Sequence, residues 1–164
     1  MKNIFYAFMA LLVIISCQES VTQPTDSAST EITESTILFD AALAKECGAD
    51  EYGMRQYVMA FLKRGPNRDR DSTEAANLQR AHLENIGKLA EAGKLSLAGP
   101  FLDDGEIRGI YIFNVKTVEE AKALTETDPA IQAGSLVMEL HPWYGSAALM
   151  KVNELHTKVS KTPI

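Results

Sequence analysis

The feature that most limits the folds open to this chain is a regular alternation of strand-like and helix-like segments after residue 55. Strand patterns, rich in β-branched and aromatic residues, are predicted at residues 56–62, 94–101, 108–115 and 136–141. Amphipathic helix patterns fall between them at residues 72–92 and 117–127. Within the second strand, Leu95 and Leu97 are expected to point to the same side of the sheet.

Both helices are bounded by residues that favour helix ends. The first is expected to begin after Asp71 and to end at Gly93, and the second opens with a capping box formed by Thr117 and Glu120. The order strand, helix, strand, strand, helix, strand predicts an α+β fold of the ferredoxin-like βαββαβ sandwich type. A further helix is expected at residues 146–159, after a last strand that Pro142 ends.

The predicted sheet is apolar on both faces. Ile110 and Ile112 point to one side of the third strand, and Tyr111 and Phe113 point to the other. Two helices cover only one face, so the second face needs a cover of its own. We expect a second copy of the chain there, packed sheet to sheet in a homodimer. The alternative is that the segments flanking the domain cap this face.

The N-terminus has the pattern of an export signal. Lys2 precedes an unbroken apolar run of twelve residues, 4–15, which a small residue and then Cys17 follow. As a helix this run spans about 18 Å, short of the ~30 Å hydrocarbon core of a bilayer. Residues 14–17, Ile-Ile-Ser-Cys, resemble the lipobox of bacterial lipoproteins, which implies cleavage before Cys17 and its lipidation. Ordinary cleavage and an uncleaved anchor remain the alternatives.

The lipobox resemblance places the protein in the bacterial cell envelope, anchored to a membrane through acyl chains on Cys17. Gln18 follows this cysteine where an Asp would favour retention in the inner membrane, so the outer membrane is favoured. Residues 18–36 are rich in Ser and Thr, include four acidic residues and lack Lys, Arg and Gly. This composition predicts a solvated tether between the membrane and the domain.

The charge of the chain argues against a nucleic-acid partner. The formal net charge is −6, and removal of residues 1–16 deletes Lys2 but no acid, leaving 15 − 22 = −7. Phosphate binding needs a basic face, which this balance does not favour. A composition of 46% apolar and 23% charged residues is that of a globular domain.

One titratable side chain falls on the apolar stripe of the first helix. On a helical wheel His82 lies between Leu78 and Ile86, aimed at the sheet. Its candidate partner is Asp128, because a His–Asp pair performs general acid–base chemistry with the carboxylate fixing the imidazole tautomer. Two other interpretations stay open: His82 as a hydrogen-bonded core residue, and Asp128 as the N-cap of a short helix beginning at Pro129.

Four motifs carry a resemblance to the YciI-like (YCII-related domain) family: Arg80-Ala81-His82-Leu83, Ala98-Gly99-Pro100, Asp128-Pro129 with Ala133-Gly134, and His141-Pro142-Trp143. The resemblance implies a ferredoxin-like fold assembled as a dimeric α/β barrel. It also implies a catalytic pair at His82 and Asp128. Ala130 stands where such proteins commonly carry a large aromatic residue, which is expected to reshape the pocket.

The resemblance implies a lyase or isomerase that acts on a small cyclic enol, lactone or phenol, with Gly99 and Pro100 contacting the ligand. The alternatives are a non-catalytic ligand-binding or accessory lipoprotein and a purely structural envelope module. The chain is then divided into a signal peptide (1–16), a lipidated Cys with its acidic tether (17–36), a lead-in segment (37–55), the α/β-barrel domain (56–144) and a C-terminal helix and tail (145–164).

No cofactor or metal site is predicted. The three histidines and Cys47 lack a ligand spacing such as His-x₃-His, and the chain has no Gly-rich phosphate loop. Cys47 is expected to be a structural or adventitious thiol.

A cluster of basic residues follows the first strand: Lys63, Arg64, Arg68 and Arg70. It is interpreted first as a solvated turn, and alternatively as a gate for an anionic ligand.

Overall fold

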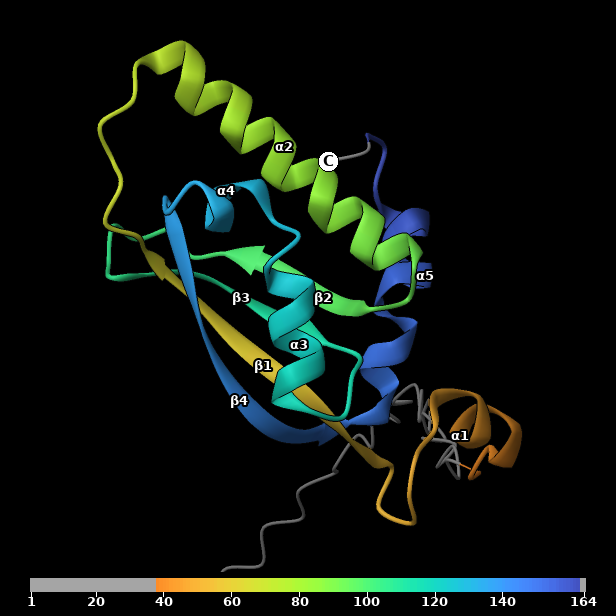
Figure 1. Cartoon of the computed structure of the whole chain (residues 1–164). Helices are drawn as coiled ribbons and strands as arrows, with labels where there is room; N and C mark the ends of the chain where they lie inside the picture. The colour runs from red at the N-terminus through yellow and green to blue at the C-terminus, as the bar shows by residue number, and fades with distance from the viewer. Residues whose placement is uncertain (1–37, 163–164) are drawn as a thin grey trace, which may run out of the picture. The chain divides into compact units, whose positions relative to one another are not determined.

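A computed structural model describes residues 38–162, in which helices cover one side of a four-stranded antiparallel sheet (Figure 1). The strands are β1 (Met54–Arg64), β2 (Leu95–Pro100), β3 (Ile107–Phe113) and β4 (Leu136–Ser146), in the spatial order β2-β3-β1-β4. The helix α2 (Ser72–Glu91) joins β1 to β2, and α3 (Val118–Thr125) precedes β4. The predicted α+β, ferredoxin-like fold class is confirmed.

The N-terminal predictions fall outside this description. The signal peptide at 1–16, the tether at 17–36 and the lipidation site at Cys17 all precede residue 38. Within residues 38–162, no helix combines the length and the apolar character that crossing a membrane requires.

The helix ends form as the local sequence predicts. The side chain of Asp71 accepts hydrogen bonds from the backbone N–H groups of Thr73 and Glu74, which caps α2. Thr117 and Glu120 form the predicted capping box at the start of α3. Gly93 follows α2 with φ of 66°, the left-handed conformation that glycine adopts at little cost.

The core lies between the sheet and the helices α2 and α3. Its buried side chains are Val58, Ala60, Leu62, Leu89, Leu95, Tyr111, Phe113, Val115 and Ala121. Alternate residues of β1 and β3 enter this core, as expected for strands whose successive side chains point to opposite faces.

The other face of the sheet is covered at one end. There Tyr57 is buried and donates a hydrogen bond to the carbonyl oxygen of Ser146 at 3.0 Å, just before the 3₁₀-helix η1 (Ala147–Lys151). η1 contacts β1, β2 and the lead-in helix α1 (Ala41–Cys47), so the flanking segments supply part of the cover.

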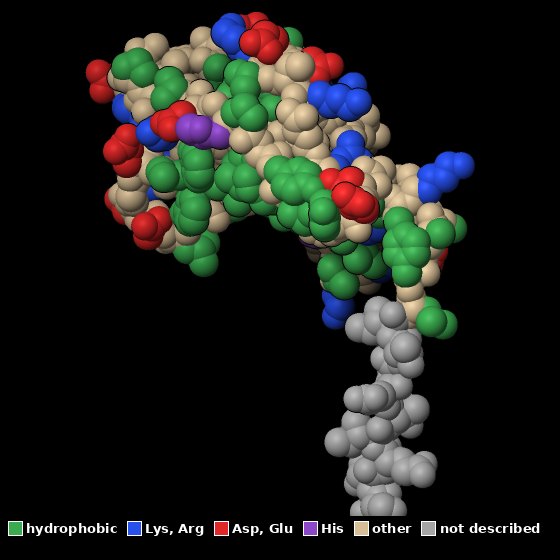
Figure 2. Space-filling view, turned by 90° about the horizontal axis from the view of Figure 1, so that it is seen from below, with side chains coloured by type: hydrophobic (Ala, Val, Ile, Leu, Met, Phe, Trp, Pro, Cys, Tyr) green, Lys and Arg blue, Asp and Glu red, His purple; other side chains and the backbone are tan. Residues whose placement is uncertain are grey.

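Farther along this face, apolar side chains remain partly exposed. Phe61 and Ile110 are half-buried, and Val137 is 42% exposed. Figure 2 shows hydrophobic side chains gathered across the hollowed underside of the molecule. The homodimer stays a prediction, and this part of the face is where a second copy is expected.

Three local expectations were wrong. Pro142 does not end β4, which pairs with β1 through Pro142 to Ser146. β4 is an edge strand, so the N–H that proline lacks is not needed for pairing. The register of β2 shifts between Leu95 and Leu97, which places their side chains on opposite faces. The C-terminal helix begins as η1 and becomes α-helical only in α5 (Val152–Val159).

Candidate functional site

The fold brings His82 and Asp128 together across 46 residues of sequence. Nδ1 of His82 lies 2.7 Å from Oδ2 of Asp128, within hydrogen-bonding distance. Their side chains are 8% and 1% exposed, so water does not screen the pair as it does a surface ion pair.

Asp128 has a second role in the local backbone. Its Oδ1 accepts a hydrogen bond from the backbone N–H of Ala130 at 2.8 Å, which caps the short helix α4 (Pro129–Gln132). The capping and the pairing interpretations therefore hold together, one through each carboxylate oxygen. Because both oxygens act as acceptors, Nδ1 of His82 is assigned as the protonated nitrogen and Nε2 as the one with the free electron pair.

Tyr111 on β3 lies on the other side of the imidazole. Its hydroxyl is 3.5 Å from Nε2 of His82, and the two rings are stacked with centroids 6.3 Å apart. Burial, and secondarily the charge of Asp128, raise the pKa of Tyr111 well above its ordinary value. Tyr111 therefore keeps its proton and can donate a hydrogen bond.

The sequence predicted that Tyr111 shares a side of the strand with Phe113, but neither which face of the sheet this is nor the proximity of Tyr111 to His82. Alternation along the strand indicates that Tyr111 and Phe113 point to the same side. The distance to His82 depends on where α2 lies over β3, for which the sequence holds no local signal.

A cavity of about 460 Å³ lies between α2 and the ends of β2 and β3. Its lining includes the predicted site residues His82, Gly99 and Pro100, together with Ala130 and Tyr111. The remaining lining residues are Leu62, Arg68, Arg70, Ala75, Leu78, Gln79, Leu83, Ile86, Ala98, Phe101, Arg108, Gly109, Ser135 and Leu136. Asp128 is not among them and lies behind the imidazole.

Small residues on the strands help to leave this space beneath α2. Ala98, Gly99 and Gly109 present little or no side chain to the cavity. Gly109 is also required by the close approach of β2 to β3, because a Cβ there would lie 2.6 Å from the carbonyl oxygen of Gly99.

The basic segment after β1 is exposed to solvent at residues 66–69, as its composition indicates, but its backbone is also docked on the domain. The backbone N–H of Gly65 donates to the carbonyl oxygen of Ser135 at 2.9 Å, and that of Asn67 donates to the carbonyl oxygen of Gly134 at 3.0 Å. These bonds dock the loop on the α4–β4 connection, which brings Arg68 and Arg70 to the cavity.

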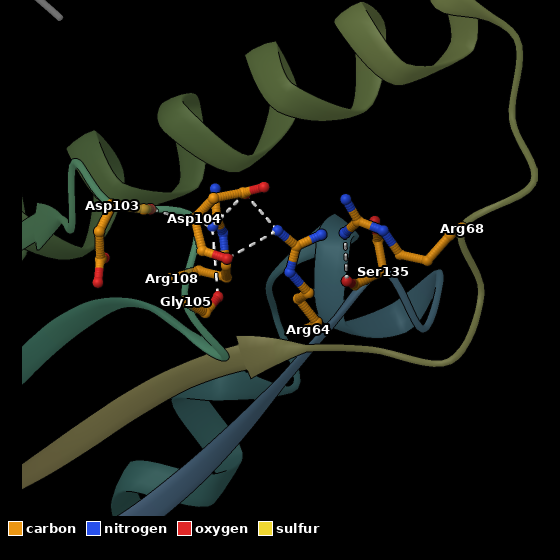
Figure 3. Close-up of polar contacts among 7 residues, drawn as sticks. All are labelled: Arg64, Arg68, Asp103, Asp104, Gly105, Arg108 and Ser135. Atoms are coloured by element: carbon orange, nitrogen blue, oxygen red, sulfur yellow. Dashed lines mark hydrogen bonds and ion pairs between the residues drawn. The ribbon is translucent and has the colours of Figure 1, made fainter.

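Arg108 is a lining residue that the sequence analysis missed. It lies at the start of β3, after the turn that contains Asp104, and its Nη1 is 3.0 Å from Oδ1 of Asp104. Figure 3 shows that Arg64 contacts the same carboxylate from the end of β1. No sequence signal indicates that an Arg after an Asp-Asp-Gly turn will line the same cavity as Arg68 and Arg70.

The other singled-out side chains lie elsewhere. His141 is exposed, with Nε2 2.8 Å from Oε1 of Glu139, and Cys47 is a buried free thiol. Within the described part of the chain, no three His, Cys, Asp or Glu side chains gather as a metal site.

Comparison with known proteins identifies the family. A search of the solved structures found 5-chloro-2-hydroxyhydroquinone dehydrochlorinase from Burkholderia phenoliruptrix, in complex with 2,5-dihydroxybenzoquinone. It is 19% identical with a TM-score of 0.39, and the match covers 52% of this chain and 92% of that chain. A search of curated proteins found no match. The family model of the YCII-related domain matches residues 56–144, more than half of the chain, and the protein therefore belongs to the YCII-related domain family.

Proposed function

We propose that this protein is a small-molecule lyase or isomerase in which His82 moves a proton and Asp128 orients it. The observation that carries the proposal is the 2.7 Å contact between Nδ1 of His82 and Oδ2 of Asp128, at the wall of a cavity. A buried carboxylate that holds Nδ1–H leaves Nε2 as the nitrogen that can act as a base.

The proposed step is the removal of a proton from a carbon next to a carbonyl or enol group of a cyclic substrate. Nε2 of His82 takes the proton, and the negative charge of Asp128 stabilises the imidazolium that forms. In an isomerase the proton returns to another carbon, whereas in a lyase the electron pair expels a leaving group and forms a double bond. The Tyr111 hydroxyl is a suitable donor to the oxygen on which charge develops.

The cavity supports a cyclic enol, lactone or phenol as the substrate class. Its volume of about 460 Å³ falls within the ~300–1,000 Å³ of ordinary ligand pockets. Leu78, Leu83 and Ile86 give it an apolar wall along α2, against which a ring would pack. Gly99 and Pro100 are proposed as backbone contacts to the ligand.

The test is turnover of a panel of such substrates by wild type, His82→Gln and Asp128→Asn. Each variant is expected to lower kcat/KM by roughly 10²–10⁴-fold. His141→Gln is the matched control, because His141 is exposed and pairs with Glu139. Equal turnover by wild type and His82→Gln, with both proteins folded by circular dichroism, would overturn the assignment.

A second candidate function is ligand binding without catalysis. It is favoured by the position of the Tyr111 hydroxyl 3.5 Å from Nε2, which gives both imidazole nitrogens a protein neighbour, as in a core histidine. Under this alternative, small cyclic ligands bind in the cavity and are recovered unchanged, and His82→Gln alters their affinity only.

Membrane anchoring through Cys17 and assembly as a homodimer are part of the same proposal. The anchor is supported by the lipobox pattern at residues 14–17 and the tether that follows it. The dimer is supported by the partly exposed Phe61, Ile110 and Val137 on the sheet face opposite α2. In a dimer with two-fold symmetry, this apolar face of each copy would be buried against the same face of the other copy.

A further inference from the structure

The wall of the cavity has a charge opposite to that of the chain. Three of the lining residues are arginines, Arg68, Arg70 and Arg108, and the lining contains no Asp or Glu. The whole chain has a formal charge of −6. The positive character of this wall is therefore local, and local excess charge inside a concave site concentrates ligands of the opposite sign.

Two of these arginines bond to uncharged groups. Nη1 of Arg68 donates to the carbonyl oxygen of Ser135 at 3.1 Å, and Nη2 of Arg70 donates to that of Ala133 at 2.7 Å. Among residues 38–162, neither guanidinium forms an ion pair. Carbonyl oxygens position a guanidinium without neutralising it, and each group keeps N–H donors for another acceptor.

Arg108 and Arg64 share one carboxylate. Both contact Oδ1 of Asp104, whose side chain is 88% exposed. Figure 3 shows Arg64, Arg68 and Arg108, from three different segments, directed toward the same space below α2. Gathering guanidinium groups in this way is unfavourable by Coulomb repulsion, which a bound anion would relieve.

Among the nearby acidic residues, Asp104 pairs with Arg108 and Arg64, and none of the others lines the cavity. Asp71 uses its Oδ1 to cap α2, accepting from the N–H groups of Thr73 and Glu74. Asp69 and Asp103 are exposed and do not line the cavity. A positive surface therefore remains available to a ligand.

The arginines are held in place before any ligand arrives. The loop that carries Arg68 and Arg70 is bonded to the α4–β4 connection through Gly65 and Asn67. Preorganised donors avoid the entropy cost of ordering on binding, which improves affinity for an anion placed among them.

We infer that the ligand of this cavity is an organic oxyanion: a small ring that carries a carboxylate or phosphate group. The ring lies along the apolar wall of α2 beside His82, and the anionic group binds Arg68, Arg70 and Arg108. Guanidinium recognises both oxyanions through paired N–H donors. The placement of the ring beside His82 rests on the proposed function, whereas the anion site stands without turnover.

The test is isothermal titration calorimetry of the full chain in detergent with four probes: benzoate, phenyl phosphate, benzyl alcohol and inorganic phosphate. At least one aromatic anion is expected to bind about tenfold or more tightly than the neutral alcohol. Raising the salt concentration is expected to weaken binding of the anion and to leave that of the alcohol unchanged. These comparisons use the wild-type protein, so they do not depend on a variant that folds.

Variants then locate the site. Arg68→Gln and Arg108→Gln are each expected to weaken anion binding about tenfold. Arg80→Gln is the matched control, because Arg80 lies on the same helix as His82, is 68% exposed and pairs with Glu84. The preference between benzoate and phenyl phosphate identifies which oxyanion the site takes.

Three outcomes would overturn the inference: no binding of either aromatic anion at millimolar concentration, equal binding of the neutral alcohol, or an equal loss in Arg80→Gln. Inorganic phosphate that binds as tightly as phenyl phosphate would overturn the ring requirement. His82→Gln separates the two proposals, since it is expected to lower kcat/KM by roughly 10²–10⁴-fold and to keep anion binding. Anion binding without turnover of any substrate would contradict the proposed function alone.

Discussion

The indole of Trp143 lies directly over Gly145, two residues farther along the same face of β4. A Cβ built at Gly145 would lie 2.1 Å from Cη2 of Trp143, far inside van der Waals contact. The indole also contacts Tyr57, with ring centroids 5.8 Å apart. Gly145 is therefore the residue that allows the indole to lie over β4 beside Tyr57, at the covered end of this sheet face.

Replacing this glycine tests the packing of that face. Gly145→Ala is expected to displace the indole and to lower the free energy of unfolding by about 1–3 kcal/mol, because the added methyl group overfills the site. Trp143 is the one tryptophan in the chain, so its emission and near-ultraviolet dichroism report the change directly. Gly87→Ala on α2 is the control, since a Cβ there meets no atom within 4 Å. Unchanged emission in Gly145→Ala would contradict the packing.

The dimer is tested by placing a charge on the partly exposed apolar face. Val137→Glu is expected to shift the protein from dimer to monomer in size-exclusion chromatography with light scattering. Lys63, opposite Val137, already pairs with Glu106 and Glu139, so a third carboxylate buried in the interface would be costly. The monomer should tolerate the change, since Val137 is 42% exposed and pairs across the strands with Lys63. Leu102→Glu, at a fully exposed position, should remain dimeric. A wild-type protein that is monomeric at micromolar concentration would rule out the dimer.

Burial of Tyr111 is expected to make the free energy of unfolding fall at alkaline pH. Burial, and then the charge of Asp128, raise its pKa above the ordinary value of 10.0, so the unfolded chain loses this proton at a lower pH than the folded one. The stabilisation is complete below pH 10 and is lost as pH rises above it, by at most about 1.4 kcal/mol per pH unit. Urea denaturation between pH 9 and 11 should therefore show a steeper loss in wild type than in Tyr111→Phe. An equal fall in the free energy of unfolding with pH in the two proteins would contradict the burial of the phenol.

Membrane attachment is expected to depend on one residue. Cys17→Ser should abolish incorporation of labelled palmitate and move the protein from the membrane fraction to the soluble fraction. Cys47→Ser is the control for a general effect of losing a thiol, since Cys47 is buried within the domain. Gln18→Asp should shift the protein toward the inner membrane on sucrose gradients. Palmitate labelling that persists in Cys17→Ser would exclude this lipidation site.

The local sequence predicted the helix N-caps, which depend on neighbours along the chain. Asp71, Thr117 and Asp128 cap helices because a side-chain oxygen meets N–H groups two or three residues away. Helical periodicity also predicted that His82 faces the sheet, since the side of a helix follows from the spacing of its apolar residues.

Predictions failed where pairing between strands decides the outcome. Alternation placed Leu95 and Leu97 on one face, but the register shift between them reverses the second side chain. Pro142 ends an isolated strand pattern, yet β4 continues because its place at the edge of the sheet removes the need for that N–H. Neither register nor edge position is encoded within a single strand.

The sequence by itself determined the order of strands and helices, the capping residues of the helices, the orientation of His82 toward the sheet, and the common side of Tyr111 and Phe113. The tertiary structure alone decided that these two side chains lie beside each other and that Asp128 reaches Nδ1. It also decided that Arg68 and Arg108 line one cavity. Local patterns record which way a residue faces, whereas contacts over long sequence separations depend on register and on how α2 crosses the sheet.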